Sequence, residues 1–379
     1  MSQNAEQHMA LSNCYYDNTM ENLLNNTYLS SLVQTGRRIY FLEHNMSIGD
    51  ALKLLAKYSI LSAPMVLMPD IEESADINTH PSLLGWLDIG DILGALLSHL
   101  SSQGEKLPTH MLSLMAALEK EGPNFANRAL ITVPVVEDRG LLYEMDAPKT
   151  SLMTVIRDAF VENAHDGGKR HVNHRIALFD SHGEIKSIIS QMDVIRWIVN
   201  QNIDDPRLSQ TIEDLGLLQG KRPVVSVDAH MPTLTAYAKI ASAGISGAPV
   251  VTESGEIIAN LSISDLRALT SEHFGVLALP VAEFLALEHH TAYIGYSVTS
   301  SSHSNHPFFA SSPRKGRLPK SHDIQVFSVS KDTTLGDALF KLCKDHIHRL
   351  YVVDCESGFP RVKAVITLTD VLQLISGVW

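Results

Sequence analysis

The sequence of 379 residues contains the same short pattern four times. Each copy is an apolar run of strand composition, followed by a polar turn and an aspartate that opens an apolar helical pattern. The copies are GWLDIGDILGALLSHL (85–100), KSIISQMDVIRWIV (186–199), ANLSISDLRALT (259–270) and KAVITLTDVLQLIS (363–376). Repeated supersecondary units must bury their apolar faces against one another, so this repetition constrains the fold more than any other feature.

The spacing of the four copies shows a second level of repetition. Their aspartates are Asp91, Asp193, Asp265 and Asp370. The first and second aspartates are about as far apart as the third and fourth, whereas the second and third are closer together. The chain is therefore a pair of repeats that has itself been duplicated.

A different cassette opens the hairpin of each repeat within a pair. The first member carries a serine shortly before a proline, in ILSAPMVL (60–67) and GISGAPVV (244–251). The second member carries a histidine followed by an arginine, in HVNHRIALF (171–179) and HIHRLYVVD (346–354). The odd-numbered repeats thus resemble each other, and so do the even-numbered ones.

Within each repeat the pattern predicts an α+β unit. Before each cassette, apolar residues recur at spacings of three and four, as in SIGDALKLLAKYSI and TLGDALFKLCKDHI, which is typical of a helix. After the cassette, APVVTESGEIIANLSI has two β-branched runs about a turn with glycine, which indicates a hairpin. Each repeat is expected to run strand-helix-strand-strand-helix. Because one repeat has too little core to be stable alone, tandem pairs should pack sheet against sheet and form a disc.

The hydroxyl and the aspartate of the closing motif allow two interpretations. The motif pairs are Ser190 with Asp193, Ser262 with Asp265, and Thr367 with Asp370. Their spacing is that of a capping box, in which both side chains only stabilise the start of a helix. An ionised carboxylate also accepts the two hydrogen bonds that the adjacent hydroxyls of a ribose donate, and a helix N-terminus attracts phosphate. The second interpretation makes these residues, together with Asp91, the ribose ends of nucleotide sites.

The even-numbered repeats add the chemistry of a phosphate site. Their cassettes contain His174 with Arg175 and His348 with Arg349. The guanidinium fork matches phosphate oxygens, and histidine adds donors whose charge depends on pH. A single histidine beside a strand is more often a partly buried, hydrogen-bonded side chain, but the duplicated pair favours phosphate binding. His171 and His346 stand at different distances before the arginine of their cassettes, so we interpret them as ordinary hydrogen-bonded side chains rather than ligand contacts.

These units resemble the CBS domain, the small repeat named after cystathionine β-synthase. Four of them with alternating cassettes resemble the gamma regulatory subunit of AMP-activated and sucrose-non-fermenting-type protein kinases, over residues 37 to 379. The resemblance implies that AMP, ADP or ATP binds non-covalently between repeats, with the His-Arg pairs on phosphate and the aspartates on ribose. It also implies a non-catalytic, energy-sensing subunit in a heterotrimer with a catalytic alpha subunit and a scaffold beta subunit.

Two repeats depart from the family pattern. In the first, Asp88 replaces the hydroxyl residue and Leu61 stands where animal gamma subunits carry an arginine, which weakens or alters the site. In the second, Asp193 stands where animal gamma subunits have a basic residue and an empty site. Asp193 favours a nucleotide that those relatives do not bind, whereas the motif SQMD lacks the lysine found in the family's phosphate channel, which disfavours it.

The repeats divide the chain into segments. We expect a flexible N-terminal arm at 1–36, CBS repeats at 37–101, 130–203, 218–290 and 323–379, and a disordered linker at 300–322. An acidic loop at 69–82 is expected to lengthen the first hairpin.

Composition and missing motifs disfavour several functions. The formal net charge of -12 disfavours a general nucleic-acid binder. We expect no membrane partner and a cytoplasmic or nuclear location, because no stretch has bilayer length and no signal-peptide pattern is present. We expect no metal site and no catalytic residues, because the three cysteines lack metal-ligand spacing and the sequence has no phosphate loop, kinase catalytic motif or nucleophile elbow. The alternative function is a CBS-domain interaction adaptor that binds another adenosyl ligand without kinase partnership.

Overall fold

The computed structural model describes residues 19–33, 38–68, 82–102, 107–134, 141–161, 172–201, 203–219, 223–289, 326–355 and 358–378. These residues form four three-stranded sheets, one for each repeat. In each sheet the first strand is parallel to the second, and the second is antiparallel to the third. The predicted α+β class is confirmed.

The four repeats share one order of elements. Repeat 1 consists of β1 (Leu42–Glu43), α3 (Ile48–Tyr58), β2 (Ser62–Leu67), β3 (Ser82–Asp88) and α4 (Ile89–Ser102). Repeat 2 consists of β4 (Leu141–Tyr143), α6 (Leu152–Thr154) continued by the π-helix η4 (Val155–Val161), β5 (Arg175–Phe179), β6 (Ile185–Ser190) and α7 (Gln191–Val199). Repeat 3 consists of β7 (Val227–Asp228), α8 (Thr233–Ser242), β8 (Gly247–Val251), β9 (Ile257–Ser262) and the 3-10 turn η6 (Ile263–Leu266). Repeat 4 consists of β10 (Ser328–Val329), α11 (Leu335–Lys344), β11 (Arg349–Asp354), β12 (Arg361–Thr367) and α12 (Leu368–Ser376).

The closing element of repeat 3 differs from the prediction. We expected an apolar helix beginning at Asp265, but the chain forms only the short turn η6 there. The helix α9 (Val281–His289) follows later, after a second 3-10 turn, η7 (Phe274–Ala278), and most of its residues are buried. The core thus receives its apolar helix face from a later segment, which is a tertiary effect that the local pattern did not contain.

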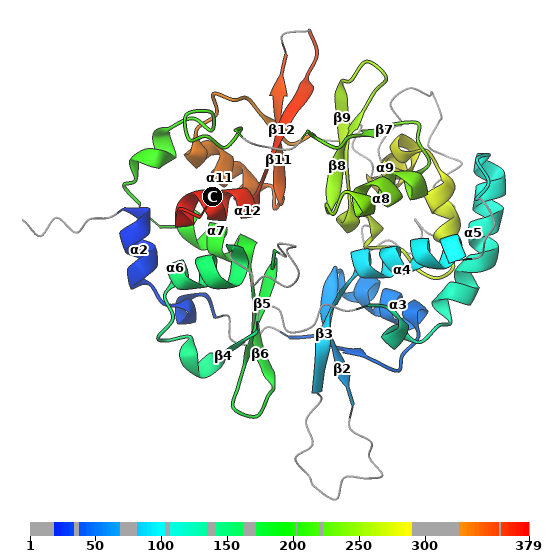
Figure 1. The fold of residues 1–379 in the computed structure, drawn as a ribbon, viewed down its shortest axis with the longest axis horizontal. Coiled ribbons are helices and arrows are strands. Elements are labelled where there is room, and N and C mark those ends of the chain that lie inside the picture. Colours follow the sequence, from blue (N-terminus) through cyan, green and yellow to red (C-terminus); the bar gives the residue numbers. More distant parts are fainter. Residues whose placement is uncertain are drawn as a thin grey trace, which may run out of the picture.

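Two hydrophobic cores hold the molecule together, and each of them joins alternate repeats. The first core combines repeats 1 and 3, for example Leu52 with Tyr237. The second combines repeats 2 and 4, for example Ile195 with Leu372. In Figure 1 the helices of repeats 1 and 3 lie on the right, those of repeats 2 and 4 lie on the left, and the hairpins point up and down between them.

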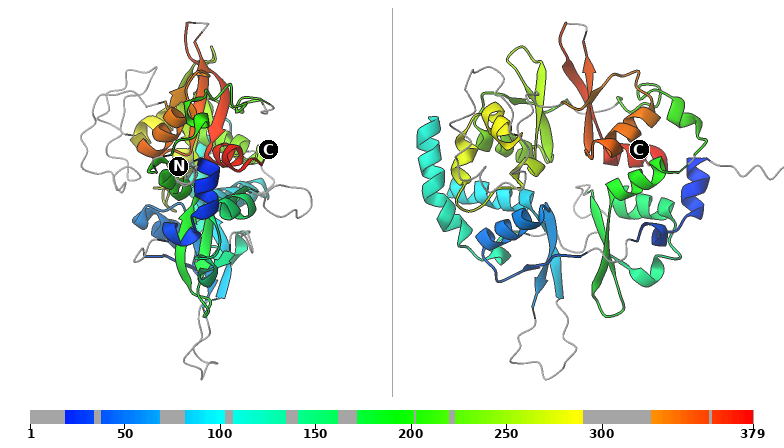
Figure 2. Two further views of the ribbon diagram at one scale, coloured as in Figure 1. Left: turned by 90° about the vertical axis from the view of Figure 1, so that its left-hand side faces the viewer. Right: turned by 180° about the vertical axis from the view of Figure 1, so that it is seen from behind.

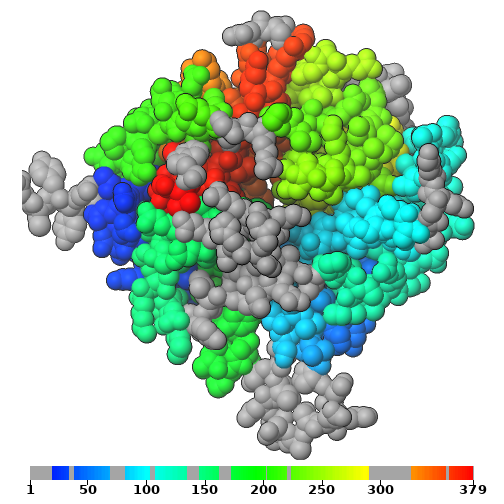
Figure 3. Space-filling view, viewed as in Figure 1, coloured from blue at the N-terminus to red at the C-terminus, as the bar shows by residue number. Residues whose placement is uncertain are grey.

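The assembly has the predicted shape of a disc. Figure 2 shows that the described elements form a flat body when it is seen edge on. In the space-filling view of Figure 3, repeats 1 and 3, in blue to yellow, fill the right side, and repeats 2 and 4, in green to red, fill the left side. The four repeats therefore surround a common centre.

Repeats that follow each other in the chain meet through their sheets. Between repeats 3 and 4, Ile257 N donates to Pro360 O at 3.0 Å, and the Tyr351 hydroxyl donates to Asn260 Oδ1. The tandem pairs are therefore arranged sheet to sheet, as expected. The apolar cores, however, run across the pairs, which is why neither pair has its own complete core.

The N-terminal segment corrects a prediction. We expected a flexible arm at 1–36, but residues 19–33 contain the helix α2 (Met20–Asn26) and the 3-10 turn η1 (Leu29–Leu32), whose leucines are buried in the second core. Met20 N donates to Asp205 Oδ2 at 3.1 Å. Apolar residues one helical turn apart, Met20 and Leu24, supply the buried face.

Other segments complete the described chain. The helix α5 (Met111–Ala126) packs on η7 and α3, and short 3-10 turns lie at Leu130–Thr132, Glu144–Asp146 and Pro206–Ser209. The predicted linker at 300–322 and nearly all of the predicted loop at 69–82 lie outside the described residues. Among the helices of the described part, none is long and apolar enough to cross a membrane.

Candidate functional site

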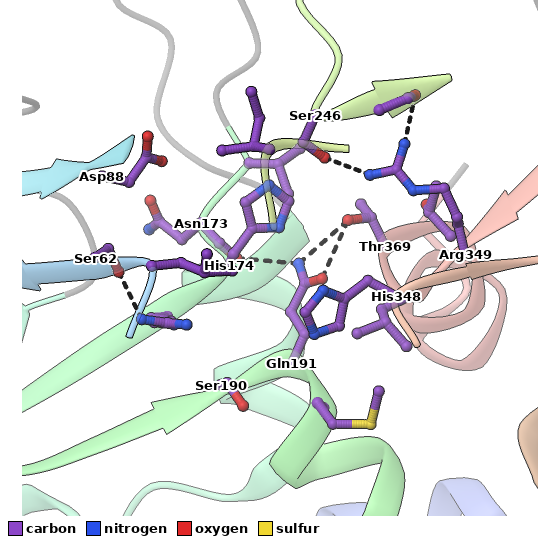
Figure 4. Close-up of a pocket in the computed structure, with 18 of the residues that line it drawn as sticks. Ser62, Asp88, Asn173, His174, Ser190, Gln191, Ser246, His348, Arg349 and Thr369 are labelled. Carbon is purple, nitrogen blue, oxygen red and sulfur yellow. Dashed lines mark hydrogen bonds between the residues drawn. The ribbon is translucent and has the colours of Figure 1, made fainter. Parts of the chain in front are cut away.

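A cavity of about 1500 Å³ lies at the centre of the disc, and all four repeats line it. The predicted phosphate residues of both even repeats lie on its wall, and these are His174, Arg175, His348 and Arg349. They come from segments that are far apart in sequence and that the fold brings to one place. Figure 4 shows His174 and His348 near the side chain of Gln191, with Arg349 beside them.

Each of the two arginines reaches across to the serine cassette of the preceding repeat. Arg175 Nη1 donates to Ser62 Oγ at 2.5 Å. Arg349 Nη2 donates to Ser246 Oγ at 2.7 Å, and its Nη1 donates to Gly247 O at 2.5 Å. The serine cassette and the His-Arg cassette therefore face each other within each tandem pair.

The two histidines are neutral at physiological pH in this arrangement. Burial, together with repulsion from Arg175, Arg349 and His174, lowers the pKa of His348 to about 4. Burial also lowers the pKa of His174, although a hydrogen bond with Gln191 opposes that shift. The positive charge beside the two rings belongs to Arg175 and Arg349, and an anion bound there would raise both histidine pKa values and favour proton uptake.

The aspartates of the closing motif do cap their helices. Asp193 Oδ2 accepts from Ser190 N at 2.8 Å and from Ser190 Oγ at 2.6 Å. Asp370 Oδ2 accepts from Thr367 N at 2.7 Å and from Thr367 Oγ1 at 2.6 Å. Both aspartates line the cavity, as do Ser190 and Thr367. Capping occupies Oδ2 of both aspartates, and Oδ1 of Asp193 lies 3.6 Å from Arg196 Nη1.

The third motif is built in the same way, but of its four residues only Ile263 belongs to the cavity lining. Asp265 Oδ2 accepts from Ser262 N at 2.7 Å, yet neither residue belongs to the cavity lining. Asp265 is 8% exposed, and its Oδ1 is 3.8 Å from His289 Nε2 of α9. The helix that replaces the expected one thus sets a histidine against this carboxylate, and the structure does not bring Asp265 and Ser262 to the predicted site.

The first motif contains a pair of carboxyl groups on the cavity wall. Asp91 Oδ2 accepts from Asp88 N at 2.8 Å, and Asp88 Oδ1 accepts from Asp91 N at 3.0 Å. Burial raises the pKa of Asp91 to about 7, and the negative charge of Asp88 contributes to the rise. The acidic replacement that the sequence revealed at position 88 therefore changes the electrostatics of this repeat.

Replacing Asp91 with asparagine is expected to stabilise the protein at pH 8 by about 1 kcal/mol, after allowance for partial solvent exposure. The folded-state pKa lies above the unfolded value, so the stability contributed by this group is complete at low pH and is lost as pH rises from about 4 towards 7. Thermal unfolding of both proteins at pH 5 and pH 8 checks this. An equal gain at the two pH values would contradict the explanation, and Asp193→Asn, which relieves no acidic pair, is the matched control.

Sequence reasoning missed one residue at the centre of the site. Gln191 is 2% exposed, and its Nε2 donates to Asn173 O at 3.0 Å and to Thr369 Oγ1 at 3.2 Å. It thereby ties the start of α7 to the start of α12. The sequence did contain a signal for this residue: the second position of the motif is polar only here, whereas the other three motifs have Ile89, Ile263 and Leu368 there.

The two histidines with an ordinary interpretation have different outcomes. His346 Nδ1 lies 3.2 Å from Arg196 Nη2, at hydrogen-bonding distance, and His346 is not part of the cavity lining. His171 lies outside the described residues. Within the described part of the chain, no cluster of histidine, cysteine, aspartate and glutamate has the arrangement of a metal site.

Comparison with known families agrees with this architecture. The CBS domain family model matches residues 214–272 and 322–377. The chain contains CBS domains. The two matched segments correspond to repeats 3 and 4, and the sheets of repeats 1 and 2 have the same strand order. The family model therefore matches two of the four repeats, and the other two are identified as CBS repeats by their fold.

Individual relatives are distant. Protein sds23 of Neosartorya fischeri is 26% identical over 187 residues, which are 48% of this chain and 30% of that protein. Protein sds23 of Aspergillus niger is 25% identical over 325 residues, which are 83% of this chain and 54% of that protein. The chain thus spans between about a third and a half of the length of these curated relatives.

One solved structure shares the overall arrangement. It is the protein MJ1225 of Methanocaldococcus jannaschii, described as a proposed archaeal homologue of the gamma subunit of AMP-activated protein kinase. The TM-score is 0.55 at 16% identity, and the alignment covers 92% of this chain and 99% of that one. At this identity the likeness establishes the fold of the CBS repeats.

Proposed function

We propose that this chain is a non-catalytic regulatory subunit that binds AMP, ADP or ATP in its central cavity and regulates an energy-sensing serine/threonine kinase. One observation carries the proposal: two arginines and two histidines from repeats 2 and 4 converge on a cavity that also holds the carboxylates of Asp193 and Asp370. Cations and ribose acceptors together match the two ends of a nucleotide.

In this proposal each part of the nucleotide has a partner. The phosphate lies between the guanidiniums of Arg175 and Arg349, and the histidines gain protons as it binds. The ribose hydroxyls donate to Oδ1 of Asp193 or Asp370. The N-termini of α7 and α12 add the positive end of a helix dipole.

Regulation follows from the bonds that the arginines already make. Arg175 and Arg349 connect even repeats to odd ones through Ser62, Ser246 and Gly247. A phosphate competes for these donors, so occupied and empty states favour different positions of neighbouring repeats. A kinase catalytic subunit and a scaffold subunit that bind one of those arrangements better would receive the signal. The resemblance of the alternating cassettes to kinase gamma subunits supports this choice of partners.

A second candidate function is a CBS-domain interaction adaptor that binds another adenosyl ligand and has no kinase partner. The observation in its favour is that two of the four aspartates are altered: Asp91 forms an acidic pair with Asp88, and Asp265 lies outside the cavity. Co-purification separates the candidates, since only the first predicts a stable heterotrimer with a kinase.

Calorimetric titration with AMP, ADP and ATP tests nucleotide binding. We expect micromolar dissociation constants and, for Asp370→Asn, binding about tenfold weaker, because an amide offers one acceptor where the carboxylate offers two. Asp265→Asn is the matched control, since it alters the same capping motif outside the cavity, and its affinity should be unchanged. If a folded protein bound none of the three nucleotides, the proposal would be wrong.

A further inference from the structure

We infer that the central cavity is one composite site with two nucleoside subsites and a single shared phosphate subsite. Its ligand class is two nucleosides joined through their 5′ oxygens by a chain of phosphates. The inference rests on the proposed function, since it specifies how nucleotides occupy the same cavity. The inference goes beyond the proposed function in two respects: it predicts how many ligands bind to one chain, and it predicts that a dinucleotide binds more tightly than AMP, ADP or ATP.

The two nucleoside subsites consist of equivalent parts. The first lies between repeats 1 and 2, where Arg175 bonds Ser62 and Asp193 caps α7. The second lies between repeats 3 and 4, where Arg349 bonds Ser246 and Asp370 caps α12. Each subsite therefore has a serine bonded to an arginine, and an aspartate at the start of a helix that would bind the ribose. Duplication of the tandem pair has therefore produced two half-sites that open into one cavity.

The phosphate ends of the half-sites are not separate. Arg175 and His174 of the first half-site and Arg349 and His348 of the second line the same cavity. Both guanidiniums lie close enough to the His348 ring to help burial lower its pKa. A phosphate bound by either half-site would therefore occupy the same region between the two arginines.

The helix starts of the half-sites also touch. Gln191, the first residue of α7, donates through Nε2 to Thr369 Oγ1 at 3.2 Å in the first turn of α12. The amide is 2% exposed, so this bond lies inside the molecule. Asp193 and Asp370 stand two and one residues further along the chain. The two ribose carboxylates therefore stand at the starts of adjoining helices, which Gln191 and Thr369 connect in Figure 4.

Electrostatics decides which ligand suits this geometry. Two nucleoside monophosphates would bring two dianions into a region with two guanidiniums, and their mutual repulsion would oppose the second binding event. A covalent phosphate chain already contains that repulsion before it binds. Its second nucleoside then binds as an intramolecular event at high effective concentration. The cavity of about 1500 Å³ also exceeds the roughly 300–1,000 Å³ that is usual for one small ligand.

Only two of the four motifs join the composite site. Asp265 lies outside the cavity lining, and Asp91 has a carboxylate neighbour, Asp88, whose charge disfavours the ionised form that a ribose needs. The even repeats, which carry the His-Arg cassettes, also carry the two suitable aspartates. Ribose and phosphate contacts thus coincide at these two half-sites.

Calorimetric titration of the full chain with AMP, ATP and diadenosine oligophosphates of increasing chain length tests this inference. We expect one diadenosine ligand per chain, bound at least about tenfold more tightly than ATP at the best chain length. The first AMP molecule should bind tightly to each chain, and the second should bind at least about tenfold more weakly. Asp193→Asn and Asp370→Asn should each reduce diadenosine binding to the affinity of a mononucleotide, while Asp265→Asn should leave it unchanged.

The possible failures can be told apart. Two equal, independent AMP equivalents, together with diadenosine ligands no tighter than ATP at any chain length, would overturn the composite site and leave the proposed function standing. Absence of binding to every nucleotide by the folded chain would overturn both. A loss of diadenosine affinity in Asp265→Asn as large as in Asp370→Asn would also overturn the inference, because it would trace the effect to helix capping.

Discussion

Arg349→Ala is expected to weaken AMP binding about a hundredfold. Arg349 is one of the two arginines of the His-Arg cassettes on the cavity wall, and its guanidinium is held in place by Ser246 Oγ at 2.7 Å and Gly247 O at 2.5 Å. Charge-assisted hydrogen bonds contribute about 1.5–3 kcal/mol each, and a tenfold change in affinity is about 1.4 kcal/mol. Isothermal titration of wild type and variant measures the loss directly.

Two comparison variants separate charge, geometry and folding. Arg349→Lys keeps the charge and loses the planar fork, so we expect an intermediate loss of about tenfold. Arg361→Ala removes another arginine that joins repeats 3 and 4, since Arg361 Nη2 donates to Ser254 O at 3.1 Å, but it lies away from the cavity lining. Wild-type affinity is expected for Arg361→Ala. Equal weakening in both alanine variants would assign the effect to the contact between repeats rather than to phosphate.

Asp205→Ala is expected to lower the free energy of unfolding by about 3 kcal/mol. The Asp205 side chain is 3% exposed and bonds Arg207 Nη2 at 2.7 Å and Met20 N at 3.1 Å. Its removal leaves the half-buried guanidinium of Arg207 and the start of α2 without their acceptor. Urea unfolding monitored by circular dichroism measures the stability, and hydrogen exchange in residues 19–33 should increase first.

The pH dependence of this effect supplies a second check. Burial raises the pKa of Asp205, but the bonds from Arg207 and Met20 outweigh burial and lower it overall. A depressed folded-state pKa contributes stability above the unfolded value near 4 and loses it as pH falls through the folded value. The difference between wild type and Asp205→Ala should therefore be full at pH 7 and shrink in acid. Asp214→Ala, which removes only an exposed bond from Thr211 Oγ1, is the control and should change stability by less than about 0.5 kcal/mol.

The order of elements within each repeat could be predicted from the sequence. Apolar residues at spacings of three and four identified α3 and α11, and the β-branched runs identified the hairpin of β8 and β9. Such periodicities depend on residues a few positions apart, so they survive in the chain itself. The pairing of His174 with Arg175 and of His348 with Arg349 was visible for the same reason, and so were the helix-capping partners three residues apart.

Only the tertiary structure decided which of these parts meet. Gln191 and Thr369 bond across 178 positions, and Arg349 reaches Ser246 across 103. Asp265 has the same motif as Asp370 but lies outside the cavity lining, 3.8 Å from His289 of the later helix α9. The cores likewise join odd repeats with odd and even with even, and they enclose α2, which the sequence suggested was a flexible arm. Helices and strands are determined largely by residues a few positions apart, so short stretches of sequence predict them. Contacts between distant segments depend instead on how several apolar faces are buried together, and no single stretch of sequence determines that arrangement.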